Sequence, residues 1–312
     1  MATRFDRAAR TRQGEAVPDR LFPAIAFRLL AVLAFATMGA LIKLAEAGGA
    51  SLVELLFFRQ ALSIPLVCAA VMIGPGLATL RTARPGAHVL RATIGLASMA
   101  CMFSAVLVLP LAEATILQFT VPIFATILGA VVLREPTGRH RWGAVIAGFV
   151  GVVIVAQPGS GTIPWIGAAL GLTAALLSST VSILLRHIGK TERATTTVFY
   201  FSLLSMLPLT PLFALSVGAH DGWTWMLLVL IGLTGGIGQI AMTSSLSLAP
   251  VAVVVPMDYS GLVWATLYGW VLFSVLPTAW TWVGAPIIVA SGLYIVWREH
   301  RLGKLTTPGV VD

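Results

Sequence analysis

The most informative shortage in this sequence is charge: only 10% of its 312 residues are Asp, Glu, Lys or Arg, whereas 58% are hydrophobic. Soluble domains have about 25% charged and about 45–50% apolar residues. A soluble fold of this size needs a charged shell, and the chain lacks the residues to build one. Apolar stretches of about 18 or more residues recur instead, each long enough to cross a hydrocarbon core of about 30 Å. The composition therefore predicts an all-α membrane protein.

The motifs of several other protein classes are also missing. The sequence has no HExxH, P-loop or GxSxG motif, and Cys68 and Cys101 stand alone in apolar stretches. Its five histidines lie in predicted loops or at the ends of spans. We therefore expect no enzyme, no resident metal or other cofactor, and no ATP site. The net charge of +8 could suit a nucleic acid, but the basic residues lie between apolar spans, so we expect none.

Hydropathy and turn residues predict ten spans, which lie near 24–45, 52–73, 88–109, 111–133, 140–157, 164–187, 195–217, 223–247, 250–273 and 279–297. All basic residues except Lys43 and Arg59 fall on one side of this arrangement, in the tails, in alternate loops and at the span ends beside them. The positive-inside rule places that side in the cytoplasm. Residues 1–22 and 299–312 are then cytoplasmic tails of a protein that membrane lipids surround, and we expect the bacterial inner membrane.

The two halves of the chain, 23–158 and 159–298, share a pattern of turn and small residues. At one constant spacing the matched pairs are Pro136/Pro277, Thr137/Thr278, Gly143/Gly284 and Gly151/Gly292. A repeat of five spans is odd-numbered, so the second copy must insert upside down. Such inverted repeats are typical of carriers that bind their solute near the midplane. The pairs Gly167/Gly171 and Gly232/Gly236 predict close helix packing but do not indicate the oligomeric state, for which a homodimer is one alternative.

Polar side chains inside the predicted spans are candidates for function, because charge in the hydrocarbon core is costly. Asp258 lies in the middle of the ninth span, where Pro256 and Gly261 loosen the helical hydrogen bonds. It could bind a cation or take up a proton, or it could be a structural acid in a salt bridge. Tyr259 follows it, and Trp264 either offers a ring to the solute or faces lipid.

The other candidates come from the second, fourth and eighth spans. Arg59 lies about two turns into its span and is either a structural anchor or a solute contact. Glu113 and Gln118 occupy neighbouring parts of one helix, whereas Phe119 suits packing better than stacking. Gln239 follows a glycine cluster that would give a thin wall beside a solute. We expect Asp258, Tyr259, Glu113, Gln118 and Arg59 to form the polar core of the cavity, with Asp258 coupling transport to a cation or proton.

Two charged residues near the predicted outer ends of the first spans have other interpretations. Lys43 and Glu54 either reach the interface or pair with each other.

Six runs of this sequence resemble the EamA family of the drug/metabolite transporter superfamily. They are FFRQ (57–60), LPLAEATILQFTVPIFATILGAVVL (109–133), LREP (133–136), RWGAVIAG (141–148), PMDYSGLVWATLYGWVLF (256–273) and TWVGAPIIVASGLYIV (281–296). The resemblance covers about 24–298. One feature departs from it: the acid before the proline is present at Glu135, read as part of a cytoplasmic turn, but the second copy has Leu276.

The resemblance implies ten helices in a 5+5 inverted repeat around a central cavity. It also implies a gradient-driven transporter that moves a small organic metabolite by alternating access. The solute could be ring-bearing or cationic, such as S-adenosylmethionine, riboflavin or an amino acid. An exporter of the same fold and a non-transporting scaffold or sensor remain alternatives. A channel would need charge rings or filter carbonyls.

Overall fold

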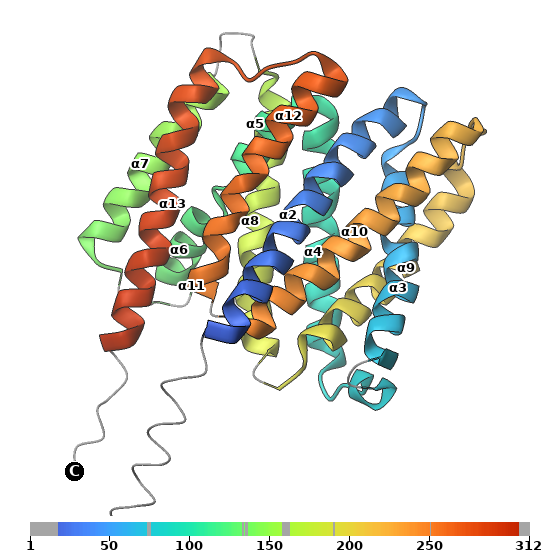
Figure 1. Ribbon diagram of the computed structural model, residues 1–312, viewed down its shortest axis with the longest axis horizontal. Coiled ribbons are helices and arrows are strands. Elements are labelled where there is room, and N and C mark those ends of the chain that lie inside the picture. The colour runs from blue at the N-terminus through green and yellow to red at the C-terminus, as the bar shows by residue number, and fades with distance from the viewer. Residues whose placement is uncertain are drawn as a thin grey trace, which may run out of the picture.

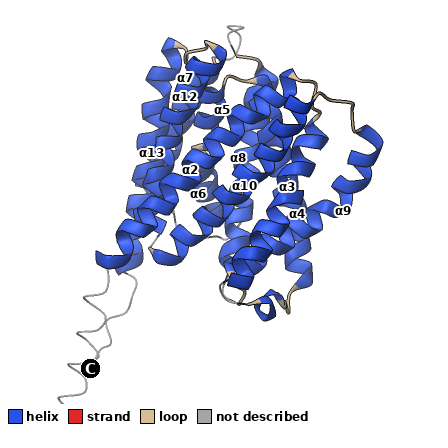
Figure 2. Cartoon of the chain, turned by 45° about the vertical axis from the view of Figure 1, so that its right-hand side comes forward, coloured by secondary structure: helices blue, strands red, loops and turns tan. Residues whose placement is uncertain are grey.

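The computed structural model describes residues 18–73, 76–132, 134, 137–157, 163–189, 191–249 and 251–305. The tail before residue 18, the turn at Glu135 and Pro136, and Lys190 lie outside these residues. Within them every regular element is a helix (Figure 2), which confirms the predicted fold class.

The helices divide between the two halves of the chain. The first half contains α2 (Pro18–Ala47), α3 (Leu52–Ile73), the 3-10 helix η1 (Leu77–Leu80), α4 (Pro85–Val108), α5 (Leu111–Gln118), α6 (Val121–Val131) and α7 (Arg139–Ala156). The second half contains α8 (Trp165–Ile188), α9 (Ala194–Ser216), α10 (Gly222–Leu248), α11 (Val251–Val254), the 3-10 helix η2 (Val255–Ser260), α12 (Gly261–Phe273) and α13 (Ala279–Leu305).

Nine segments of the described chain are long and apolar enough to cross a membrane, with α5 and α6 together forming the fourth. The predicted span at 250–273 is divided into three elements, α11, η2 and α12. Pro256 has no amide hydrogen to donate, so the α-helical ladder cannot continue through it and tightens into a 3-10 turn. With this broken segment the described chain has ten crossing segments, as the hydropathy predicted.

Consecutive crossing segments run in alternating directions, and the beginning of α2 lies on the same side as the end of α13 (Figure 1). Each half contributes five crossing segments, so corresponding helices of the two halves run in opposite directions. The halves also exchange partners: α2 packs on α10, and its counterpart α8 packs on α4. The other large contacts pair α7 with α13, α3 with α10 and α3 with α9.

Small residues allow these close helix contacts. A Cβ at Gly232 of α10 would overlap the carbonyl oxygen of Phe58 in α3. A Cβ at Gly171 of α8 would lie 2.6 Å from the Leu117 side chain of α5. Lipid tails are as apolar as the side chains, so the hydrophobic effect does not drive helices together within a membrane. Close approach of the two backbones stabilises the helix pair instead, through van der Waals packing. The two glycine pairs predicted from the sequence therefore do lie at helix–helix contacts.

Candidate functional site

The main candidate site is a cavity of about 710 Å³ between the two halves of the chain. A volume of this size is typical of sites for small organic molecules. Helices α2, α3, α4 and α5 of the first half and α8, α9 and α10 of the second half contribute its walls. Much of the wall is apolar, with side chains such as Met38, Met99, Met102 and Phe103.

The cavity is open at one end. Its lining includes exposed residues at the joint between α8 and α9, among them Leu185, Gly189 and Ala194. At the other end the lining residues Ile42 and Phe103 are almost completely buried. The opening therefore faces the side on which α2 begins and α13 ends (Figure 1).

Arg59 is buried deep in this cavity and belongs to a side-chain network between α3 and α10. One of its terminal nitrogens donates to Gln60 Oε1 at 2.8 Å, and the other donates to Gln239 Oε1 at 3.2 Å. Gly235 makes room for the arginine, since a Cβ there would lie 3.2 Å from Arg59 Cγ. The structure thus brings together Arg59 and Gln239, two residues that the sequence singled out separately.

Arg91 is a cavity residue that the sequence interpretation missed. Its side chain leaves α4 about two turns after the helix begins, and the residue is only 6% exposed. The guanidinium carbon lies 3.8 Å from the centre of the Phe201 ring, a cation–π arrangement. One turn along α4, Gly95 leaves space for the arginine, because a Cβ there would lie 3.0 Å from Arg91 Nη1.

Other polar side chains on the cavity wall join α4 and α5 to α8. Gln118 Nε2 donates to the carbonyl oxygen of Gly171 at 3.4 Å. Ser98 donates to the Ala174 carbonyl at 3.0 Å, and its hydroxyl lies 2.8 Å from that of Ser178. Of the expected polar core, the structure therefore places Gln118 and Arg59 in one cavity.

Asp258 does not line this cavity, contrary to the expected polar core. Both of its carboxylate oxygens accept hydrogen bonds from Arg28 of α2, one from Nε at 2.5 Å and one from Nη2. Asp258 belongs to η2, which packs against α2. The structure thus shows the salt bridge that the sequence left open, and it assigns Arg28 a partner inside the protein.

Glu113 also lies outside the cavity. It is 1% exposed and accepts hydrogen bonds from the Thr281 hydroxyl at 2.9 Å and the Thr278 amide at 3.3 Å. The Thr278 amide lies just before α13, so the carboxylate ties α5 to the beginning of that helix. In this conformation the hydrogen bonds of Glu113 are those of a structural acid.

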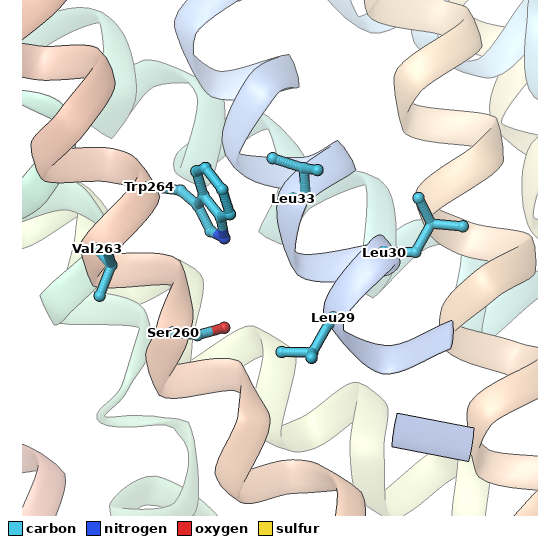
Figure 3. A pocket seen from close by; sticks show the side chains of 6 residues that line it. All are labelled: Leu29, Leu30, Leu33, Ser260, Val263 and Trp264. Carbon is cyan, nitrogen blue, oxygen red and sulfur yellow. The ribbon is translucent and has the colours of Figure 1, made fainter. Parts of the chain in front are cut away.

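The aromatic candidates also lie away from the cavity. Phe119 packs edge-on against Tyr259 at a centroid distance of 4.8 Å, and the Tyr259 hydroxyl occupies the space beside Gly292. Trp264 belongs to α12 and, with Leu29 and Leu33 of α2, lines a separate apolar groove between the two helices (Figure 3). Phe119 thus packs as expected, and Trp264 contacts a surface groove.

Glu192 lies at the mouth of the cavity, in the joint between α8 and α9. Its carboxylate accepts from the Thr82 hydroxyl at 2.7 Å and the Ala83 amide at 3.2 Å, and His88 Nε2 lies 3.7 Å away. Partial burial alone would raise the pKa of Glu192, but these hydrogen bonds and the nearby histidine together lower it. The carboxylate is therefore held in its charged form at neutral pH.

The lowered pKa of Glu192 makes a prediction for stability. The ionised carboxylate stabilises the folded protein above the ordinary pKa of a glutamate, and this contribution is lost as the pH falls through the lowered pKa. Thr82→Val removes the hydrogen bond to the Glu192 carboxylate and the one that the Thr82 hydroxyl accepts from the Arg84 amide, and it is expected to cost about 2 kcal/mol at neutral pH. Thermal unfolding between pH 7 and acid should show the deficit shrinking as the pH falls; a deficit that persists unchanged in acid contradicts this explanation.

Comparison with known proteins identifies the family. The model of the EamA-like transporter family matches residues 22–157 and again residues 165–297. The chain belongs to the EamA-like transporter family. The two matched ranges correspond to the two halves of the structure, so this EamA-like transporter is a multi-pass membrane protein built from two repeats.

Named relatives of this EamA-like transporter move different solutes. The riboflavin transporter of Rhizobium johnstonii is 31% identical over 72% of this chain and 75% of the relative. The pseudopaline exporter of Pseudomonas aeruginosa is 29% identical over 88% and 96%. The S-adenosylmethionine uptake transporter of Rickettsia felis is 25% identical over 80% and 84%. A crystal structure with 19% identity and a TM-score of 0.61 covers 89% of this chain and 98% of its own, and shows the shared fold.

Two histidine–glutamate contacts occupy corresponding places in the repeats of this EamA-like transporter. On the open side, His88 of α4 faces Glu192 just before α9. On the closed side, His220 just before α10 lies 2.7 Å from Glu54 of α3. Each contact links the second crossing segment of one repeat to the third of the other. Glu54 also accepts from the Ser51 and Gly218 amides, so it is engaged by α3 and the α9–α10 loop and forms no pair with Lys43.

Proposed function

We propose that this EamA-like transporter is a secondary carrier that moves a small organic solute by alternating access. The cavity of about 710 Å³ between the repeats carries this proposal, because it is deep and open at one end only. A carrier needs such a site, which each side of the membrane reaches in turn. The moving units of the proposal are the two repeats, residues 23–158 and 159–298, and no catalytic step accompanies transport.

The proposed orientation places the protein in the bacterial inner membrane with both tails in the cytoplasm. Basic residues concentrate on the side of the cavity opening, and such residues mark the cytoplasmic side of membrane proteins. The bacterial relatives that carry solutes are consistent with this location. In this orientation the described conformation is open to the cytoplasm.

The proposed solute contacts are Arg59, Gln118 and Gln239, because their side chains line the cavity. Riboflavin, S-adenosylmethionine and pseudopaline, named for the relatives, are organic solutes that set the range to be tested. The S-adenosylmethionine relative is named for uptake and the pseudopaline relative for export, whereas the name of the riboflavin relative gives no direction. The experiment therefore also measures the direction of transport.

Reconstitution into liposomes tests the proposal directly. Labelled riboflavin, S-adenosylmethionine and amino acids are offered to vesicles of each orientation, with and without a proton gradient. A carrier gives saturable uptake and counterflow when unlabelled solute is preloaded, whereas a scaffold or sensor gives neither. Uptake that increases linearly with concentration and shows no counterflow contradicts a carrier mechanism.

Ser182→Trp is expected to reduce the initial rate of uptake about tenfold or more while the protein remains folded. Ser182 lines the cavity near its mouth and is exposed, so the indole would occupy solute space without displacing the core. Ser216→Trp is the matched control: both hydroxyls donate to the carbonyl one turn earlier, but Ser216 lies at the other end of the bundle. Equal rates for the two variants would contradict the assignment of the cavity as the solute path.

A further inference from the structure

The charge on the cavity wall is unevenly distributed. Among the described lining residues, Arg59, Arg91 and Glu192 carry formal charges. Glu192 lies at the mouth and is engaged by Thr82, Ala83 and His88. The two arginines lie deeper, and each is at least nine-tenths buried. The interior of the cavity is therefore positive.

Neither arginine has an acidic partner in the part of the chain that the structure describes. Among the described residues no carboxylate lies within 4.0 Å of Arg59 or Arg91, and Arg59 donates only to amide oxygens. Arg59 Nε and the Nε and Nη1 of Arg91 are buried with no hydrogen-bond acceptor. A buried charge without a partner is costly, so an acceptor that came within reach of these donors would be bound favourably.

Both guanidinium groups approach the same aromatic ring. The carbon of the Arg91 guanidinium lies 3.8 Å from the Phe201 centroid, and that of Arg59 lies 6.0 Å from it. The ring partly compensates the positive charge, but two cations around one ring repel each other. An anion placed between the two guanidinium groups would attract both of them and accept hydrogen bonds from their unpaired nitrogens.

A third buried arginine shows what a structural role looks like in this protein. Arg28 is 7% exposed, and both oxygens of Asp258 accept hydrogen bonds from it. Arg59 and Arg91 are buried to a similar extent but pair with no acid among the described residues. The difference points to a partner that arrives from outside the chain.

We propose that Arg59 and Arg91 form an anion subsite and that the transported solute carries a carboxylate or phosphate group there. This inference rests on the proposed function, because it assigns the solute class of the same cavity. Guanidinium groups bind both anions through paired hydrogen bonds. Met38, Met99, Met102 and Phe103 would contact the apolar part of the solute. The solute is thus an organic anion, whereas Asp258, the residue that would suit a cationic solute, is paired with Arg28.

Matched pairs of compounds test the inference in the detergent-purified full chain. The probes are nicotinate against nicotinamide, riboflavin 5′-phosphate against riboflavin, and inorganic phosphate against potassium chloride at equal ionic strength. We expect the anionic member of at least one pair to raise the unfolding midpoint saturably and more than its neutral or chloride partner. A general salt effect would change all variants equally.

Variants of the two arginines locate the binding. Arg59→Gln and Arg91→Gln are each expected to weaken the apparent affinity for the anion about tenfold or more, because a charge-assisted hydrogen bond is lost. Arg91→Lys keeps the charge and should retain part of the preference. Arg81→Gln is the control, since Arg81 is an exposed arginine on the same side of the protein.

The outcomes separate this inference from the proposed function. Equal stabilisation by both members of every pair, no anion-dependent shift at all, or an anion effect that survives both glutamine substitutions would overturn the anion subsite. Saturable uptake of a neutral solute by the same protein would then leave the carrier intact. If anions bind through the arginines but no solute shows counterflow in liposomes, the subsite stands and the carrier function fails.

Discussion

Asp258→Asn is expected to lower the free energy of unfolding by about 3 kcal/mol, because Arg28 would lose its only acidic partner among the described residues. Asparagine can accept one hydrogen bond through its oxygen, but its amide group would face the guanidinium with a second set of donors. The Asp258 side chain is 34% exposed, so water can reach the site. The expected loss of stability is therefore near the lower end of the range for broken buried ion pairs, which is about 3–5 kcal/mol. Equilibrium unfolding in mixed micelles measures it.

A double-mutant cycle decides whether the loss comes from the pair. Arg28→Gln combined with Asp258→Asn should be more stable than the sum of the single losses predicts, with a coupling of about 1–3 kcal/mol. Glu46→Gln, which removes an exposed acid at the end of α2, is the control and should be close to neutral. Additive losses in the cycle would show that the two side chains act independently.

The same variant addresses the coupling role proposed for Asp258 from the sequence. Proton uptake at Asp258 would require its pair with Arg28 to open in another conformation of the carrier. Transport that keeps its rate and pH dependence in Asp258→Asn would restrict this residue to a structural role. A lost pH dependence in a variant that still binds solute would support coupling.

Gly232→Leu is expected to destabilise the protein by about 3 kcal/mol or more. The new side chain would meet the backbone oxygen of Phe58 and the side chain of Leu62, and α3 and α10 would have to separate. Overpacking a close contact costs about 1–3 kcal/mol even where side chains can adjust, and a backbone atom cannot rotate away. Purified yield and the unfolding midpoint in detergent measure the effect.

Gly222→Leu provides the matched control in the same helix. Gly222 begins α10, and a Cβ there meets nothing within 4 Å. This variant should fold as well as the wild type. The difference in stability between Gly232→Leu and Gly222→Leu then reports the helix contact separately from the helix propensity of leucine. Similar losses in both variants would contradict the importance of the close approach at Gly232.

The fold was predictable because hydropathy and turn residues act locally. The crossing segments follow from apolar length, and the break in the ninth segment follows from Pro256, which cannot donate a backbone hydrogen bond. Gly232 and Gly171 could be assigned to close contacts because small residues have few other uses in lipid.

The site was only partly predictable, because depth along a span does not reveal the partner of a side chain. Arg59, Gln118 and Gln239 line the cavity, whereas Glu113 and Asp258 are engaged elsewhere by hydrogen bonds from distant segments. Those partners come from tertiary contacts that no local pattern encodes.

The contacts of Arg28 and Arg91 inside the protein could not be predicted for another reason. Both were counted with the basic residues that set the orientation, since they lie near the ends of predicted spans. The structure buries both of them within helices. The signal that could have identified Arg91 is its place within α4, which begins at Pro85, a residue that suits the first turn of a helix.

The exchange of partners between the repeats has a consequence for how the chain folds during synthesis. The first helix, α2, finds its main neighbour in α10, and α4 finds its own in α8. When the ribosome has completed the first repeat, the helices that α2 and α4 pack against have not yet been synthesised. Until then, α2 and α4 lie in the bilayer as inserted segments without their principal contacts. Such long-range pairings are slow to form. We therefore expect the two repeats, produced as separate polypeptides, to resist proteolysis only when they are made together.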